Sequence, residues 1–128
     1  MGSPVVHFDI IGANPDSLRS YYSELFDWEF DVPSPVAPEI SDADEYGFVT
    51  PVPMGSPDTI PGGVGGGPGF APHTVFYVGV PNVEAALLRA ESLGGRRVVG
   101  PARNPNGQLV VAHFTDPEGN LIGLAGPS

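Results

Sequence analysis

The chain has 128 residues, no cysteine and no lysine, and its 15 acidic side chains give a formal net charge of −10. This length predicts a single domain over residues 1–128, and the absence of cysteine excludes disulfides and thiolate chemistry and fits a cytoplasmic protein. The charge argues against nucleic acid or an anionic membrane as a partner, and no apolar run is long enough to span a bilayer. Residues 1–64 carry eleven acids against Arg19 alone, whereas residues 65–128 balance four acids with four arginines.

The chain opens with a predicted strand over residues 5–11, followed by a helix. Alternation along the strand gives one apolar face for the helix and a second face on which His7 and Asp9 are expected to line a wet space. Asn14 is the predicted N-cap of the helix and Pro15 its first residue. The apolar stripe of the helix is expected at four positions: Leu18, Tyr21, Tyr22 and Leu25.

The rest of the first half alternates short strands with turn-rich segments. Strands are predicted over residues 28–32, 46–52 and 60–64, with a loop over 33–44. Trp28 is expected to pack under the helix or at an interface between modules. The glycines from Gly62 to Gly69 are interpreted as a flexible strand and linker, because no lysine and no helix follow them as in a phosphate-binding loop.

The second half repeats this order of elements. A strand over residues 73–80 opens with His73, and Asn82 is the predicted cap of a second helix that ends at Gly94. Strands follow over residues 96–99, 107–114 and 121–125. The helix stripe is expected at Val83, Ala86, Leu87 and Ala90. The order strand–helix–strand–strand–strand therefore occurs twice, with His7 and His73 expected at the same place in each copy, which predicts an internal duplication.

A tight hairpin is predicted near the C-terminus. Pro117 presets the turn, Asp116 can accept from the backbone two residues on, and Gly119 tolerates a positive φ. The strand after the turn contains Gly123, a residue that in a strand marks a close approach or an open space.

Several segments together carry a resemblance to a known family. They are Val6–Ile10, Ser20–Trp28, His73–Val78, Ala85–Gly95 and Phe114–Asn120. With these the chain resembles the vicinal oxygen chelate superfamily, which includes glyoxalases, bleomycin resistance proteins and extradiol dioxygenases. The resemblance implies an α+β fold of two tandem βαβββ modules, about 4–67 and 71–126, that form a curled mixed sheet around a cleft with the helices outside. It also implies a homodimer.

The resemblance further implies where a metal ion would lie. Metal-dependent members bind a divalent ion with a histidine in the first strand of a module and a glutamate in the last, and His7 and His73 match the histidine positions. Gly123 stands where those members have glutamate, and the last strand of module one has no carboxylate. Asp9, Glu118 and Asp58 are the candidate substitutes. No strongly bound cofactor is therefore expected, with a divalent metal at His7 and His73 as the alternative.

The predicted function is the binding of a small, largely apolar molecule in the cleft by a glyoxalase-like protein. The residues expected to line the cleft are His7, Asp9, His73, Val75, Tyr77, His113 and Gly123. His113 falls on this face when positions are counted by two from Leu109, and its alternative is an ordinary histidine at a strand end. The alternatives for the whole protein are a metal-dependent lyase, isomerase or dioxygenase-like enzyme, acid–base chemistry by His7 and His73, and a dimeric regulatory or interaction module. Whether a reaction is catalysed is left open.

Overall fold

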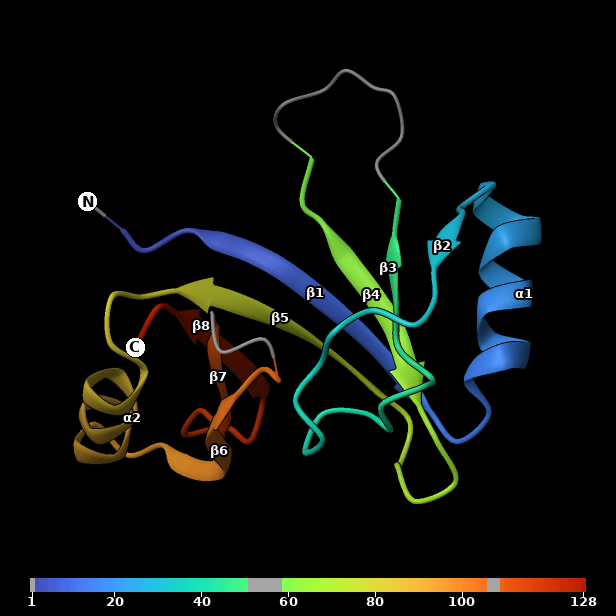
Figure 1. Ribbon diagram of the computed structural model, residues 1–128. Helices are drawn as coiled ribbons and strands as arrows, with labels where there is room; N and C mark the ends of the chain where they lie inside the picture. Colours follow the sequence, from blue (N-terminus) through green and yellow to red (C-terminus); the bar gives the residue numbers. More distant parts are fainter. Residues whose placement is uncertain (1, 51–58, 106–108) are drawn as a thin grey trace. The chain divides into compact units, whose positions relative to one another are not determined.

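The computed structural model describes residues 2–50, 59–105 and 109–128. These residues form eight strands and two helices, an α+β fold in agreement with the prediction (Figure 1). The chain divides into two compact units. We call His7–Thr74 the N-unit, and Met1–Val6 together with Val75–Ser128 the C-unit. Within the described ranges, neither helix is both long and apolar enough to cross a membrane.

The N-unit holds one helix and four strands in the order β2-β3-β4-β1. β1 and β4 run parallel, and β3 is antiparallel to both β4 and β2. Only the first two residues of β1 belong to the C-unit. The elements are β1 (Val5–Gly12), α1 (Pro15–Phe26), β2 (Phe30–Asp31), β3 (Gly47–Val49) and β4 (Gly62–Gly66).

The C-unit repeats this topology with the strand order β5-β8-β7-β6. Its first and last strands, β5 and β8, run parallel, and the other neighbours are antiparallel, as in the N-unit. The shared order and directions confirm that the predicted order of elements occurs twice. The elements are β5 (His73–Gly79), α2 (Val83–Ser92), β6 (Arg96–Arg103), β7 (Val110–Thr115) and β8 (Leu121–Gly126), and the first two residues of β5 belong to the N-unit.

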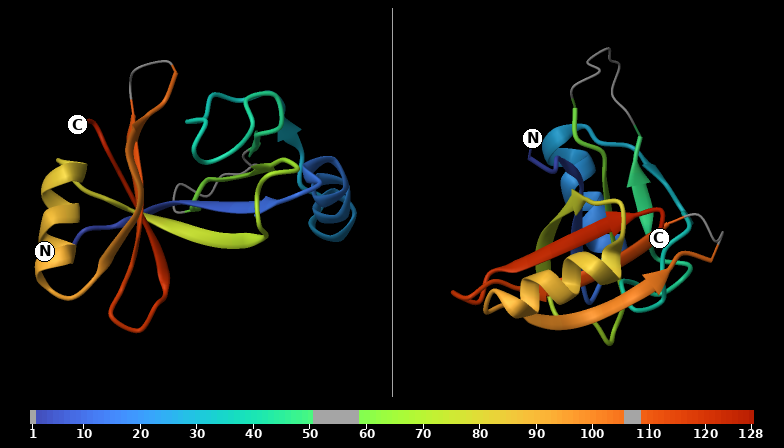
Figure 2. Two further views of the ribbon diagram at one scale, coloured as in Figure 1. Left: turned by 90° about the horizontal axis from the view of Figure 1, so that it is seen from below. Right: turned by 90° about the vertical axis from the view of Figure 1, so that its left-hand side faces the viewer.

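The helix of the C-unit packs as its sequence pattern predicts. Asn82 caps α2 by accepting from the Ala85 backbone N–H at 2.8 Å. Val83 and Leu87 are fully buried against Ala112 and its neighbours in the sheet. Figure 2 shows α2 lying along one face of this sheet. The spacing of apolar residues three and four apart is therefore enough to orient this helix.

The helix of the N-unit begins as predicted, but its buried face is different. The Asn14 side chain caps α1, and the chain leaves the helix at Asp27 with a φ of 60°. The buried side chains of α1 are Pro15 and Arg19, whereas Tyr21 is 59% exposed and Leu25 is 55% exposed. The predicted stripe is therefore wrong for these two residues, because α1 buries the side of the helix that carries Arg19, a residue that the apolar count did not include.

The aromatic residues around Trp28 form part of the contact between α1 and the sheet. The Trp28 ring lies 5.9 Å from the Phe8 ring and 5.6 Å from the Tyr22 ring, measured between centroids. Phe8 is thus on the helix face of β1, as the alternation predicted. Trp28 packs under the helix, the first of the two places expected for it.

Several strand boundaries differ from the predicted ranges. β2 has only two residues where a strand over 28–32 was expected, and β6 continues to Arg103. The predicted strand positions 51–52 and 107–108 lie outside the described residues. The glycine-rich segment is not a flexible linker throughout, because Gly62–Gly66 forms the fully buried strand β4.

Candidate functional site

A buried carboxylate organises the polar group of the N-unit. Asp9 is only 3% exposed, and the Tyr46 hydroxyl donates a hydrogen bond to its Oδ1 atom. His7 Nε2 lies 3.2 Å from the same oxygen and 2.9 Å from Tyr46 Oη. Because Tyr46 gives its proton to the carboxylate, the network assigns the donated proton of the second contact to His7 Nε2. The carboxylate therefore fixes both the tautomer and the orientation of the imidazole.

His7 is the member of this group that reaches the surface. Its side chain is 23% exposed, while Asp9 and Tyr46 are buried. The imidazole meets the ring of Phe48 edge-on, with 5.9 Å between centroids, and Phe48 is itself 37% exposed. The face predicted to be wet is therefore buried at Asp9, whose Oδ1 atom accepts from Tyr46, and is partly exposed at His7.

Tyr46 is the residue of this group that the sequence analysis missed. Its ring lies along β4, where a Cβ atom on Gly63 would be 2.1 Å from Tyr46 Oη and one on Gly65 would be 2.8 Å from Tyr46 Cδ1. Glycine is thus required at these strand positions so that the ring can approach the backbone. The run of glycines in β4 was the available signal, but it does not say which aromatic residue covers them.

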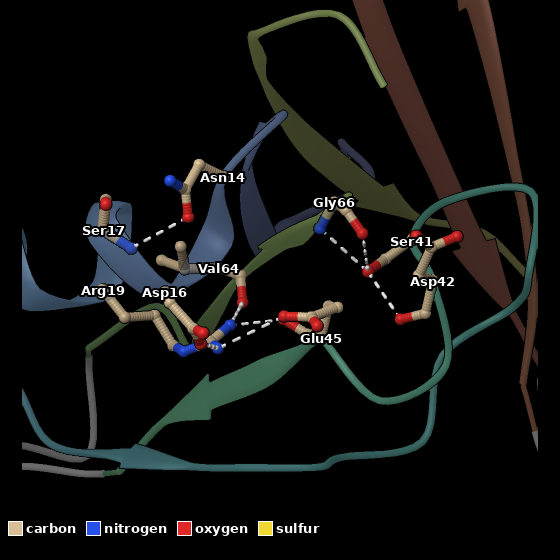
Figure 3. A network of polar contacts seen from close by, with 9 residues as sticks. All are labelled: Asn14, Asp16, Ser17, Arg19, Ser41, Asp42, Glu45, Val64 and Gly66. Carbon is tan, nitrogen blue, oxygen red and sulfur yellow. Dashed lines mark hydrogen bonds and ion pairs between the residues drawn. The ribbon is translucent and has the colours of Figure 1, made fainter. Parts of the chain in front are cut away.

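A second network holds the segment that leads into Tyr46 (Figure 3). The buried guanidinium of Arg19 donates to the backbone carbonyls of Glu45 and, at 3.5 Å, of Val64, and it pairs with Asp16 at 2.6 Å. Ser41 Oγ accepts from the Gly66 backbone N–H at 2.9 Å. Since Glu45 directly precedes Tyr46, these contacts tie α1, the loop before β3 and strand β4 together around the site.

The C-unit contains a second tyrosine–histidine pair. Tyr77 Oη lies 2.8 Å from His113 Nε2, and the two residues are 2% and 4% exposed. Gly123 is opposite Tyr77 in one strand pair and opposite His113 in the other. A Cβ atom on Gly123 would lie 2.5 Å from the Tyr77 ring, so this glycine marks a close approach and not an open space. Val75, two residues before Tyr77, is buried as well.

His73 lies in different surroundings from His7. Its Nδ1 atom donates to the Ala71 carbonyl at 2.9 Å. Its side chain lines a groove of about 640 Å³ in the N-unit, whose other walls are the end of β1 and the first turns of α1.

The two histidines are also not equivalent in the repeat. The N-caps Asn14 and Asn82 are 68 residues apart, so His7 corresponds to Val75, not to His73. The expectation that His7 and His73 occupy the same place is therefore wrong by two residues.

The donor set of the described residues does not fit the metal site that the resemblance implies. The last strands, β4 and β8, carry Gly63 and Gly123 in place of a carboxylate, and a tyrosine ring fills the space above each of them. Across residues 2–50, 59–105 and 109–128, no three histidine or acidic side chains gather where they could hold an ion. Of the candidate substitutes, Asp9 is bonded to Tyr46, Glu118 is exposed in a turn, and Asp58 lies outside the described residues.

Comparison with known proteins establishes the family. A sequence model described as the Glyoxalase/Bleomycin resistance protein/Dioxygenase superfamily matches residues 5–124, and the chain belongs to this superfamily. A search of curated proteins finds no match.

Solved structures with a similar fold include methylmalonyl-CoA epimerases. A variant of the Streptomyces coelicolor enzyme, in complex with 2-nitronate-propionyl-CoA, has a TM-score of 0.63 at 15% identity, covering 98% of this chain and 95% of that chain. The enzyme from Mycobacterium tuberculosis has a TM-score of 0.58 at 17% identity, covering 97% and 87%. A hypothetical protein from Bacillus halodurans has a TM-score of 0.63 at 14% identity, covering 100% and 96%. At these identities the likeness concerns the fold alone.

Proposed function

We propose that the protein binds a small, largely apolar molecule without a strongly bound metal ion, and that His7 is its polar contact. The observation that carries this proposal is the partly exposed imidazole of His7, which hydrogen-bonds to Asp9 and Tyr46 and meets the exposed ring of Phe48 edge-on. An apolar ligand can lie against the aromatic ring while one polar group bonds the imidazole. A few fixed polar groups in apolar surroundings are typical of small-molecule sites.

We further propose that the ligand is uncharged. Residues 1–64 carry a net charge of −10, and the Arg19 guanidinium of this half is buried and bonded to Asp16 and Glu45. A polyanion such as the acyl-CoA analogue bound by the Streptomyces epimerase variant would be repelled by this charge. An aromatic or alicyclic alcohol or ketone would not.

A thermal-shift screen tests the proposal. The panel contains uncharged aromatic and alicyclic alcohols and ketones, with an acyl-CoA as the anionic comparison, each measured with and without EDTA. A ligand at about 100 times its Kd stabilises the native state by about 2.7 kcal/mol, which for a small domain raises Tm by roughly 10 °C. We expect such a rise for uncharged compounds, unchanged by EDTA and lost in His7→Ala.

His73→Ala is the matched control, since it removes a partly buried imidazole that bonds the Ala71 carbonyl and lines the groove beside α1. Its response to the same ligands should equal that of the wild type. The absence of a response to every uncharged compound would refute the proposal, as would a response that depends on added metal.

A second candidate function is proton transfer on the same ligand. It is favoured by the hydrogen bond between Asp9 and His7, because a carboxylate that orients an imidazole is a common arrangement for a general base. Incubation of any ligand found in the screen in D2O, followed by NMR, distinguishes the two functions. Exchange of a ligand C–H that is lost in His7→Ala indicates catalysis, and unchanged ligand indicates binding alone.

The expectations on partners and location are proposals of the same kind. We propose a homodimer that acts in the cytoplasm and binds neither nucleic acid nor membranes. The absence of cysteine and the acidic charge support the compartment and the excluded partners, and the family resemblance supports the dimer. Sedimentation at micromolar concentration tests the dimer directly.

A further inference from the structure

The groove beside α1 in the N-unit is lined mainly by apolar and aromatic side chains. Its volume of about 640 Å³ lies in the range of small-molecule sites. One wall is formed by residues 10–14, at the end of β1 and just after it, and a second wall by residues 72–74. The third wall is the side of α1 that carries Leu18, Tyr21 and Tyr22. All of these residues belong to the N-unit, so the groove is complete within one compact unit.

Two perpendicular tyrosine rings form the aromatic part of the groove. The rings of Tyr21 and Tyr22 meet at 83°, with 5.1 Å between their centroids. Tyr21 is 59% exposed, so a ligand can reach its ring. The rings of Phe26 and Trp28 lie 5.9 Å and 5.6 Å from the Tyr22 ring and hold it in place. Aromatic faces that approach from two directions are the kind of surface that recognises alkylammonium groups.

The charge around the groove favours a cation. The N-unit has eleven acidic side chains, and its single arginine, Arg19, is buried and paired with Asp16. Glu24 lines a neighbouring hollow that shares Ser17 and Tyr21 with the groove. A cation on the Tyr21 ring would therefore lie close to a carboxylate, whereas an anion would be repelled.

We propose that this groove binds a quaternary ammonium compound with an apolar body. The methylated ammonium group lies against the rings of Tyr21 and Tyr22, and the apolar body lies against Leu18 and the end of β1. The faces of the rings attract the positive charge, and the acidic surroundings add to this attraction. The site is separate from the His7 group, and it does not depend on the ligand proposed there.

The test uses two probes of the same shape and different charge. (3-Hydroxyphenyl)trimethylammonium is the cation, and 3-tert-butylphenol is its uncharged isostere. Each is titrated into ¹⁵N-labelled protein, and the amide shifts of Ser17, Leu18 and Tyr21 give the Kd for the groove, independently of any ligand at His7. We expect the cation to bind with a Kd on the order of 1 mM. The isostere should bind there about fivefold more weakly or less, the difference that a cation–π contact makes at an exposed site.

Variants of Tyr21 separate the aromatic contribution from simple apolar contact. Tyr21→Leu keeps an apolar side chain but removes the ring, so it should raise the Kd of the cation about fivefold and change that of the isostere less than about twofold. Tyr21→Phe keeps the ring and should keep both affinities. Phe76→Leu is the matched control, because Phe76 is an exposed aromatic residue of the C-unit, and it should change neither affinity.

Three titration results would overturn the proposal. They are an equal affinity for the two probes, no shift of the α1 amides at cation concentrations well above the expected Kd, and an equal loss of affinity in Phe76→Leu and Tyr21→Leu. Sedimentation tests whether a second copy of the chain covers the groove instead. The wild type and Tyr21→Leu should sediment alike, and a dimer that dissociates in Tyr21→Leu would also overturn the proposal.

Discussion

The glycine residues of β4 are required because aromatic rings pack directly against the backbone of this strand. A Cβ atom on Gly62 would lie 2.1 Å from the Phe8 ring on one face of the strand, and one on Gly63 would lie equally close to Tyr46 Oη on the other. Such contacts cannot be relieved by small adjustments, because the strand is fully buried. At the scale of the single residue, the space left by the glycines of β4 is as necessary to the site as the Asp9 carboxylate is.

Arg19 is the other residue whose role is clear only in three dimensions. The residue is 8% exposed, and its guanidinium bonds two backbone carbonyls, those of Glu45 and Val64. Backbone carbonyls buried without a donor are costly, so loss of this side chain leaves more than one group unsatisfied. The residue therefore stabilises the segment that positions Tyr46.

We predict that Arg19→Met lowers the free energy of unfolding by about 2–4 kcal/mol, since it keeps the volume but removes the buried donors. Urea denaturation monitored by Trp28 fluorescence measures this. Asp16→Asn is the control, because Asp16 is 84% exposed and its pair with Arg19 should contribute less than about 1 kcal/mol. Equal losses in the two variants would show that the ion pair matters more than the backbone contacts.

At the scale of the element, the hairpin between β7 and β8 is specified almost entirely by its own sequence. Asp116 Oδ1 accepts from the backbone N–H groups of Glu118 and Asn120, both at 2.9 Å, and Gly119 has a φ of 92°. The predicted turn chemistry is confirmed at each of these positions. The hydrogen bonds from Asn120, first from its side chain and then from its backbone, lower the pKa of Asp116 below its usual value.

This lowered pKa predicts a pH dependence of stability. A carboxylate with a pKa lower in the folded than in the unfolded chain stabilises the fold above its unfolded pKa, and that contribution is lost as the pH falls through the folded pKa. We expect Tm to fall on acidification below about pH 4, and to fall less steeply in Asp116→Asn than in the wild type. Calorimetry from pH 7 to pH 2 measures both slopes, and parallel curves would contradict the prediction.

The two helices show when a pattern of apolar residues predicts the buried face of a helix and when it does not. In α2 the stripe contains only small and aliphatic residues, and Val83 and Leu87 of this stripe are buried. In α1 the stripe contains two tyrosines, and Arg19 lies under the helix where the count placed exposed residues. Hydrophobic periodicity does not identify an arginine that is buried because backbone carbonyls of other segments accept its hydrogen bonds.

At the scale of the whole molecule, the two halves share a topology but not a charge. The first 64 residues carry a net charge of −10, and the remaining residues are neutral. Self-repulsion of this kind opposes the compact state and is screened by salt. The first half therefore folds despite electrostatic repulsion among its acidic side chains.

We predict that raising NaCl from about 10 mM to 300 mM, which shortens the Debye length severalfold, increases Tm by several degrees. The reason is that the folded N-unit holds its acidic side chains closer together than the unfolded chain does. Differential scanning calorimetry measures the shift in Tm. An uncharged osmolyte at equal osmolality controls for non-ionic effects. A Tm that falls with salt would mean that attractive ion pairs, such as that of Arg97 with Glu84, outweigh the repulsion.

The sequence by itself determined the order of the elements, both helix caps, the hairpin turn and the internal repeat, because each depends on residues close together in the chain. His7 and Asp9 were also found from local alternation. Only the tertiary structure decided that Tyr46 bonds both of them, that Tyr77 and His113 form a buried pair, and that the glycines Gly63 and Gly123 make room for rings. The hydrogen bonds join residues 36 to 39 positions apart, and no local rule specifies which ring covers which glycine.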